Sequence, residues 1–159
     1  MKAKLYLETT IPSYLVGWPS RDLLVAAHRQ ITRDWWESRR TEFDLCVSEF
    51  VIQEVGEGDA QLASRRLELL AGLPVLAASQ EIMKLAQDLV TEGPIPSKAA
   101  IDATHIAIAT VHRCEYLLTW NCRHIANAEL HRGIRRVIVE YGYEMPTLCT
   151  PEELMGERP

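Results

Sequence analysis

The chain has 159 residues, 47% of them hydrophobic and 25% charged, a balance that is ordinary for a globular protein. This length suits one domain with a sizeable core, and we therefore expect a single domain over residues 1–159. The net charge of -5 argues against a surface built throughout for nucleic acid, although it is compatible with a local basic rim.

The cysteines and the N-terminus indicate the compartment. The four cysteines are scattered and form neither a C-x-x-C pair nor the His/Cys spacing of a zinc site, which favours a reduced, intracellular protein. The N-terminus lacks a positively charged region followed by an apolar one, and no apolar run reaches the roughly 18 residues of a membrane span. We therefore expect a soluble, cytoplasmic protein with no membrane contact.

Short apolar runs alternate with segments of helical periodicity along the chain. Apolar runs predict strands, residues recurring at i, i+3 and i+4 predict helices, and Ser48 and Ser79 are candidate N-caps. In chain order we expect a strand at 4–7, a helix from 10, a helix at 20–40, a strand at 43–47, helices at 49–57 and 60–71, a strand at 74–77, helices at 79–92 and 98–113, a strand at 115–119, a helix at 123–131, a strand at 135–139 and a short terminal helix from 150. Every expected strand is thus followed by a helix.

This alternation is typical of an α/β fold, in which helices cover both faces of a parallel sheet. In such sheets functional groups gather at the C-terminal edge of the strands. Glu8 directly follows the first strand, and Glu54 lies on the helix after the second. Asp102 lies on the helix before the fourth strand, and Asn121 comes just after that strand. We therefore expect these residues to converge at one edge of the sheet.

Three of these residues are carboxylates, which suits a divalent cation. Mg²⁺ and Mn²⁺ take oxygen ligands and, once bound, activate water and neutralise charge on a phosphoryl group. Asp102 is the strongest candidate, because the helix around it is apolar almost all round and predicts burial. A buried ionised Asp needs a cation or a set of donors. The alternative is an acid tied to a backbone donor or to a nearby Arg.

At these residues the chain resembles a known family. The segments LYLETTIPSYL, VSEFVIQEV, AAIDATHIAIA and LLTWNCRHI look like the PIN domain and, more narrowly, like the VapC-type toxins and their stand-alone relatives. The likeness runs over roughly the whole chain in the right order, and the DATHIAIA-to-LTWN module is its strongest part. It implies a PIN-like (Rossmann-like) three-layer α/β/α sandwich with a central, mostly parallel sheet. The implied activity is Mg²⁺- or Mn²⁺-dependent hydrolysis of RNA phosphodiester bonds.

Carried over residue by residue, the resemblance implies catalytic roles for Glu8, Glu54, Asp102 and Asn121, with the three acids as metal ligands. Two departures from the family pattern matter. The first acid is usually Asp, and Glu8 is one methylene longer, so that the ion or the backbone must shift by about an ångström. The fourth acid is replaced by Asn121, which keeps a carbonyl oxygen but carries no charge. One bound ion therefore fits this set better than two.

The same departures motivate an alternative, a degenerate PIN domain that binds RNA or a protein partner without cutting. A third possibility is another Rossmann-like enzyme, such as a small phosphatase. It is weaker, because the loop after the first strand has no phosphate-cradling glycines and no second Asp two residues after Glu8. For a toxin, the resemblance further implies a small antitoxin as partner and a homodimer.

Four further side chains leave alternatives open. His105 and His124 lie close in sequence to two of the candidate site residues, and each is a candidate proton shuttle or extra ligand. The simpler interpretation of each is a helix histidine satisfied by a backbone carbonyl or by water. Trp35 falls on the apolar stripe of its helix, which predicts a place in the core or in a dimer interface. Trp18 lies in a loop and suits a protein contact or base stacking equally well.

Overall fold

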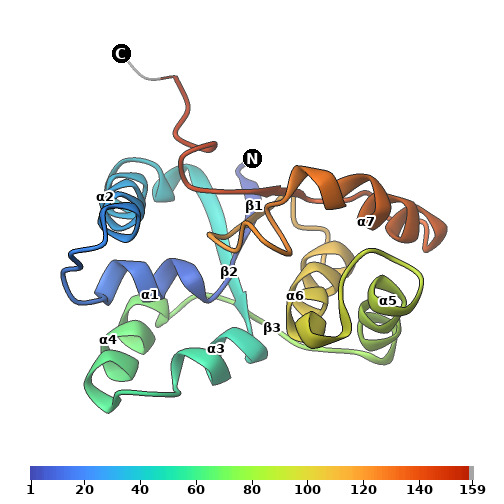
Figure 1. Ribbon diagram of the computed structural model, residues 1–159, viewed down its shortest axis with the longest axis horizontal. Helices are drawn as coiled ribbons and strands as arrows, with labels where there is room; N and C mark the ends of the chain where they lie inside the picture. Colours follow the sequence, from blue (N-terminus) through green and yellow to red (C-terminus); the bar gives the residue numbers. More distant parts are fainter. Residues whose placement is uncertain (158–159) are drawn as a thin grey trace.

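The computed structural model describes residues 1–157 and contains a parallel sheet. Its strands are β1 (Ala3–Leu7), β2 (Phe43–Ser48), β3 (Val75–Leu76), β4 (Tyr116–Leu118) and β5 (Thr147–Cys149). They lie in the order β3-β2-β1-β4-β5, and every neighbouring pair is parallel (Figure 1). The predicted central sheet is therefore confirmed, and it is parallel throughout.

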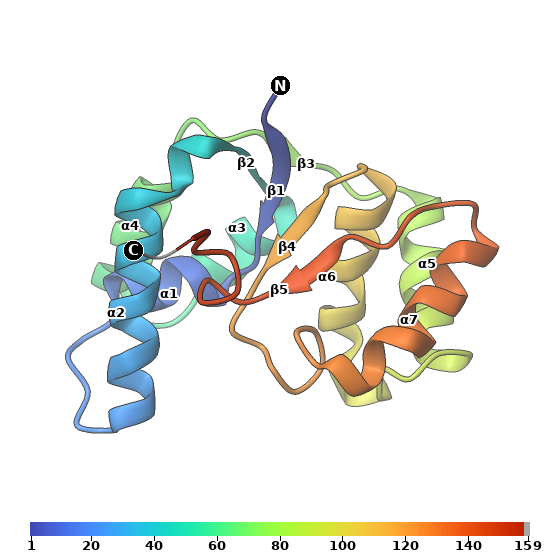
Figure 2. The ribbon, with the colours of Figure 1, turned by 90° about the horizontal axis from the view of Figure 1, so that it is seen from above.

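Helices cover both faces of this sheet. They are α1 (Thr10–Val16), α2 (Leu23–Ser38), α3 (Glu49–Val55), α4 (Ala60–Leu70), α5 (Gln80–Thr91), α6 (Ala100–Val111) and α7 (Ala128–Glu140), with 3-10 turns at Arg40–Glu42 and Ser97–Ala99. In both views α1, α2 and α4 lie on one side of the sheet, with α3 beside α4, and α5, α6 and α7 lie together on the other (Figures 1 and 2). The predicted three-layer α/β/α arrangement is confirmed.

The helix starts follow local capping chemistry. The hydroxyl of Ser48 accepts a hydrogen bond from the backbone N–H of Val51 at 3.2 Å, and Ser79 caps α5 in the same way. Both predicted N-caps are confirmed. Helix α2 begins later than the predicted residue 20, because the carboxylate of Asp22 accepts from the first free N–H groups of the helix.

The predicted elements of the C-terminal third are partly wrong. The expected helix at 123–131 and strand at 135–139 are replaced by the single helix α7, and the last strand is β5. The residues Ile134, Val137 and Ile138 are buried on one side of α7, so the apolar run has helical rather than strand periodicity. Gly133 lies inside this helix. A Cβ there would meet the ring of Pro94 at 3.0 Å, so a larger residue at this position would crowd that ring.

The expected terminal helix is also absent from the described residues. Thr150 and Glu153 form a capping box. The backbone N–H of Thr150 donates to the Glu153 carboxylate at 3.0 Å, and the N–H of Glu153 donates back to the Thr150 hydroxyl at 3.4 Å. The chain beyond Thr150 then makes turns without continuing into a helix. A capping box alone therefore does not extend a helix here, since helix stability comes mainly from packing of an apolar face.

Helix α6 forms the centre of the second helical layer. Its residues 103–110 are all buried, in keeping with an apolar surface on nearly every side. Because α6 leads through a short loop into β4, it runs antiparallel to the sheet, and its first turn with Asp102 lies at the carboxyl edge of the strands. Within the part of the chain that the structure describes, no helix is long and apolar enough to cross a membrane.

Trp35 lies in the core, one of the two places predicted for it. Its side chain is fully buried, and its ring stacks on Phe43 with 5.8 Å between the centroids. The indole N–H donates to the backbone carbonyl of Leu154 at 3.2 Å. Trp35 thus joins α2, β2 and the C-terminal segment. Trp18, by contrast, is 58% exposed.

Replacing Trp35 with alanine is expected to lower the free energy of unfolding by about 3–5 kcal/mol, because a large buried ring leaves a cavity. Urea denaturation followed by circular dichroism measures the loss. Val139→Ala is the control, because Val139 is 58% exposed, and it should change the free energy by less than about 0.5 kcal/mol. Equal losses in the two variants would contradict the placement of Trp35.

Candidate functional site

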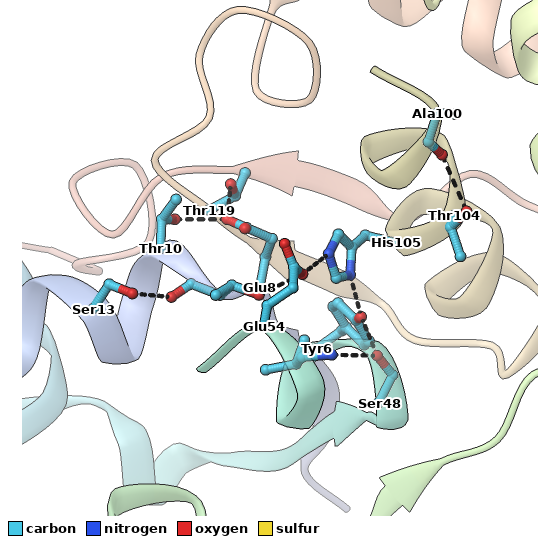
Figure 3. A network of polar contacts seen from close by, with 12 residues as sticks. Tyr6, Glu8, Thr10, Ser13, Ser48, Glu54, Ala100, Thr104, His105 and Thr119 are labelled. Carbon is cyan, nitrogen blue, oxygen red and sulfur yellow. Dashed lines mark hydrogen bonds and ion pairs between the residues drawn. The ribbon is translucent and has the colours of Figure 1, made fainter. Parts of the chain in front are cut away.

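Glu8, directly after β1, is the most deeply buried acid of the candidate site, with 5% of the residue exposed. Its backbone N–H donates to the carbonyl of Leu118 at 3.1 Å and so extends the pairing of β1 with β4. Oε1 of its carboxylate accepts hydrogen bonds from the hydroxyls of Thr10 and Thr119, both at 2.6 Å (Figure 3). Both donors are neutral, so they satisfy the oxygen without compensating its charge.

Glu54 lies in the last turn of α3 and also bonds through one carboxylate oxygen. Its Oε1 accepts from the hydroxyl of Thr9 at 2.8 Å and lies 2.6 Å from Nε2 of His105 (Figure 3). Thr9 and Thr10 are consecutive residues, and they bind Glu54 and Glu8 respectively. The start of α1 therefore brings these two acids together, although they are far apart in the sequence.

The contacts of Glu54 favour its charged form. Burial by itself raises the pKa of the carboxyl group. The contact with His105, together with the hydrogen bond from Thr9, outweighs burial and holds the pKa below its ordinary value of 4.5. Glu54 is therefore a carboxylate at neutral pH.

Asp102 and Asn121 are joined through His124. Nδ1 of His124 lies 3.0 Å from Oδ2 of Asp102, and the backbone N–H of His124 donates to Oδ1 of Asn121 at 3.0 Å. The backbone N–H of Asn121 donates in turn to the hydroxyl of Thr119 at 2.9 Å, and this hydroxyl binds Glu8. The structure thus brings all of the candidate residues to the carboxyl edge of the sheet.

The three acids share one feature, which is that each is anchored through a single carboxylate oxygen. Glu8 and Glu54 receive both of their donors on Oε1, and Asp102 meets His124 through Oδ2. The second oxygen of each acid makes no hydrogen bond with another described residue. Among residues 1–157, the ion pairs of these acids involve histidines only, with no Lys or Arg. Each acid is held in place while one oxygen is left for a further ligand.

The simpler interpretation of the two histidines is wrong, because His105 and His124 each contact an acid of the site. The sequence also did not single out Thr119, which binds both Glu8 and the backbone of Asn121. The available signal was its position as the last residue of the predicted fourth strand. A hydroxyl at that place faces the same edge of the sheet as the acid that follows β1.

The donor set fits a hard divalent cation by its chemistry, since carboxylate oxygens are the ligands that Mg²⁺ and Mn²⁺ prefer. The burial of Glu8 fits as well, because a buried charge with neutral donors only is unfavourable. The side chains are not closed around one point, however. Among the described residues, no group of three or more His, Cys, Asp or Glu side chains is arranged to hold a metal ion. Binding an ion would therefore require these side chains to move closer together.

Comparison with solved structures identifies the fold. The chain is similar to a chain of a toxin-antitoxin complex from Klebsiella pneumoniae, with a TM-score of 0.56 and 20% identity over 78% of this chain and 92% of that one. It is also similar to a chain in the crystal structure of VapBC2 from Rickettsia felis bound to a DNA fragment from their promoter, with a TM-score of 0.53 and 17% identity over 76% of this chain and 89% of that one. The chain shares their fold. No family model matches the sequence, and no curated protein matches it either.

Glu54→Gln is expected to make the free energy of unfolding depend less on pH below pH 7. The pKa of Glu54 is depressed in the folded state, so its ionised form contributes stability above the unfolded value near 4.5, and that contribution is lost as the pH falls through the folded value. At pH 7 the free energy of unfolding of the wild type should be higher than that of the variant by about 1 kcal/mol, the size expected for a partly exposed pair. Urea titrations between pH 7 and 3 measure the difference. A gap that stays constant over this range would contradict the assignment.

Proposed function

We propose that this protein is a metal-dependent ribonuclease of PIN type, in which Glu8, Glu54 and Asp102 hold one Mg²⁺ or Mn²⁺ ion. The observation that carries the proposal is the single-oxygen anchoring of these three acids, with hydroxyl and imidazole partners and no Lys or Arg. Such a set is negatively charged, positioned and open to a cation. The shared fold and the sequence resemblance to PIN domains support the same activity.

Each residue of the site has a role that its contacts suit. Glu8 is held by two hydrogen bonds of 2.6 Å and is the most deeply buried of the proposed ligands. Asp102 and Glu54 each have a histidine partner that orients the carboxylate. The amide of Asn121 is suited to orient a water molecule, because it carries both donors and an acceptor. When bound, the ion activates water and neutralises the charge that builds up on the phosphodiester during attack.

The comparison with solved structures supports a proposal about the partners of this chain. One similar structure is a toxin-antitoxin complex, and we propose that this chain is the toxin of such a pair, with RNA as substrate and a small antitoxin as inhibitor. The uncompensated carboxylates suit a guanidinium group supplied by that antitoxin. Trp18, Leu23 and Leu24 are exposed around the start of α2, and this apolar surface suits a homodimer. A small reading frame directly upstream, encoding a DNA-binding segment and a tail, would support the pair.

A second candidate function is binding of RNA or protein without cleavage. It is favoured by the open arrangement of the acids, in which no described group of side chains is ready to hold a metal ion. It is also favoured by Asn121, which contributes no charge at the place of a fourth acid. Isothermal titration calorimetry with Mn²⁺ separates the two functions, since absence of binding at millimolar metal favours the second.

Asp102→Asn is expected to lower metal-dependent RNA cleavage by at least about a hundredfold, because it removes a charged oxygen ligand while keeping the size of the side chain. Cleavage of labelled RNA is measured with Mn²⁺ and again with EDTA. The matched control is Asp44→Asn, an exposed acid near the opposite end of β2. Cleavage that survives both Asp102→Asn and EDTA would sink the proposal.

Asn121→Asp is expected to tighten Mn²⁺ binding by about tenfold, because a fourth carboxylate adds Coulomb attraction for the cation. Calorimetric titration measures the dissociation constant. Asn127→Asp is the control, since it adds the same charge at the N-cap of α7 and keeps a capping oxygen. If both variants bind Mn²⁺ as the wild type does, Asn121 lies outside the ligand sphere.

A further inference from the structure

A chain of buried polar side chains runs from the interior of the sheet to Glu54. The hydroxyl of Ser48 lies 2.7 Å from that of Tyr6, and the Tyr6 hydroxyl lies 2.6 Å from Nδ1 of His105. Nε2 of His105 lies 2.6 Å from Oε1 of Glu54. Figure 3 shows the succession from β1, the end of β2 and α6 to α3. The contacts connect three separate segments through polar atoms alone.

Burial changes sharply along this chain. Tyr6 and Ser48 are 0% exposed, and His105 is 1% exposed. The side chain of Glu54 is 32% exposed. Burial and the neighbouring acids raise the pKa of Tyr6 well above its ordinary value of 10.0, so that the phenol keeps its proton and can donate it in a hydrogen bond. Only the last member of the chain therefore reaches solvent.

The direction of the hydrogen bonds follows from the partners of Ser48. Its hydroxyl oxygen accepts from the backbone N–H of Val51 at 3.2 Å, so its hydrogen is free to go to Tyr6. Tyr6 then donates to Nδ1 of His105, and the hydrogen of the imidazole lies on Nε2, where it is donated to Glu54. The opposite tautomer would place two acceptors 2.6 Å apart at Glu54. A doubly protonated ring would donate to the Tyr6 oxygen and would leave one hydroxyl hydrogen, that of Tyr6 or of Ser48, without an acceptor among the described residues.

From this geometry we infer that Ser48, Tyr6 and His105 are positioning residues, which fix Glu54 so that Oε1 is occupied and Oε2 is presented to a ligand. The inference rests on the proposed function, since the ligand is the proposed divalent cation. Buried polar groups are unfavourable compared with apolar ones of the same shape. If these positions served only to pack the core, apolar residues such as Phe and Leu would fill them without burying polar groups. This series of hydrogen bonds ends at Glu54, the member of the series that reaches solvent, and Glu54 is the proposed metal ligand whose orientation matters.

Tyr6→Phe tests the chain with the smallest change, since it removes one buried hydroxyl and keeps the ring. In the wild type without metal, ¹⁵N NMR of labelled histidine should show His105 with its hydrogen on Nε2. In Tyr6→Phe the Nδ1 acceptor loses its donor, so its ¹⁵N signal should move toward that of an imidazole nitrogen without a hydrogen bond, while the hydrogen stays on Nε2 beside the Glu54 carboxylate. A wild-type ring with its hydrogen on Nδ1 would overturn the inferred direction.

Mn²⁺ affinity, measured by calorimetry, gives the second readout. Loss of a group that orients a metal ligand typically weakens binding 10–100-fold. We therefore expect Tyr6→Phe to lower the affinity for Mn²⁺ about tenfold and His105→Leu to lower it further. His105→Gln should recover part of the affinity, because its amide N–H can donate to Glu54. Tyr143→Phe is the control, since its hydroxyl donates to the exposed carboxylate of Glu81 at 3.0 Å. Unfolding curves confirm that each variant is folded.

The outcomes separate the inference from the proposed function. A folded Tyr6→Phe protein that binds Mn²⁺ as tightly as the wild type would overturn the inference alone. A wild type that binds no Mn²⁺ and cleaves no RNA would overturn the proposed function and, with it, the positioning role. Weaker binding in Tyr6→Phe, with partial recovery in His105→Gln and no change in Tyr143→Phe, is the expected result.

Discussion

The rest of the site depends on a carboxylate that is buried at the end of the middle strand. Glu8 follows β1 and is 5% exposed, so its charge loses most of its contact with water, which is unfavourable without donors. Thr10 and Thr119 donate to it, and Thr10 also accepts from the backbone N–H of Trp120 at 2.8 Å. Satisfying Glu8 therefore constrains both how α1 begins and how the chain leaves β4.

The strand order explains why distant segments meet at this carboxylate. Strand β1 pairs with β2 on one side and with β4 on the other, so the residues that follow all three strands share one edge. Helix α6 runs back along the sheet and is buried from 103 to 110. This path places Asp102 in its first turn at the edge and His105 one turn further in, against Glu54. The site is thus a consequence of topology and not of any one local segment.

The fold class and the N-caps Ser48 and Ser79 were predictable because they depend on local chemistry and on hydrophobic periodicity. The strand predicted at 135–139 is wrong, because a short apolar run fits both the strand period and the helix period. Packing of α7 against α5, a non-local contact, decides between them. The histidine partners have the same origin: His105 and Glu54 are 51 positions apart, and His124 and Asp102 are 22 apart. Such contacts depend on the three-dimensional path of the chain, which one sequence does not reveal.

An amide at Asn121 favours the stability of the metal-free protein but lowers the affinity for the proposed ion. A fourth carboxylate beside Glu8 and Asp102 would add like-charge repulsion, which neutral hydroxyl donors offset poorly. The amide avoids this repulsion, and its Oδ1 accepts the backbone N–H of His124 and so holds the loop after β4. The same residue removes one negative charge from the ligands available to a cation. Because Asn121 adds no charge, hydroxyl and imidazole partners are sufficient to hold the three acids close to one another. The cost is a lower affinity for the proposed ion.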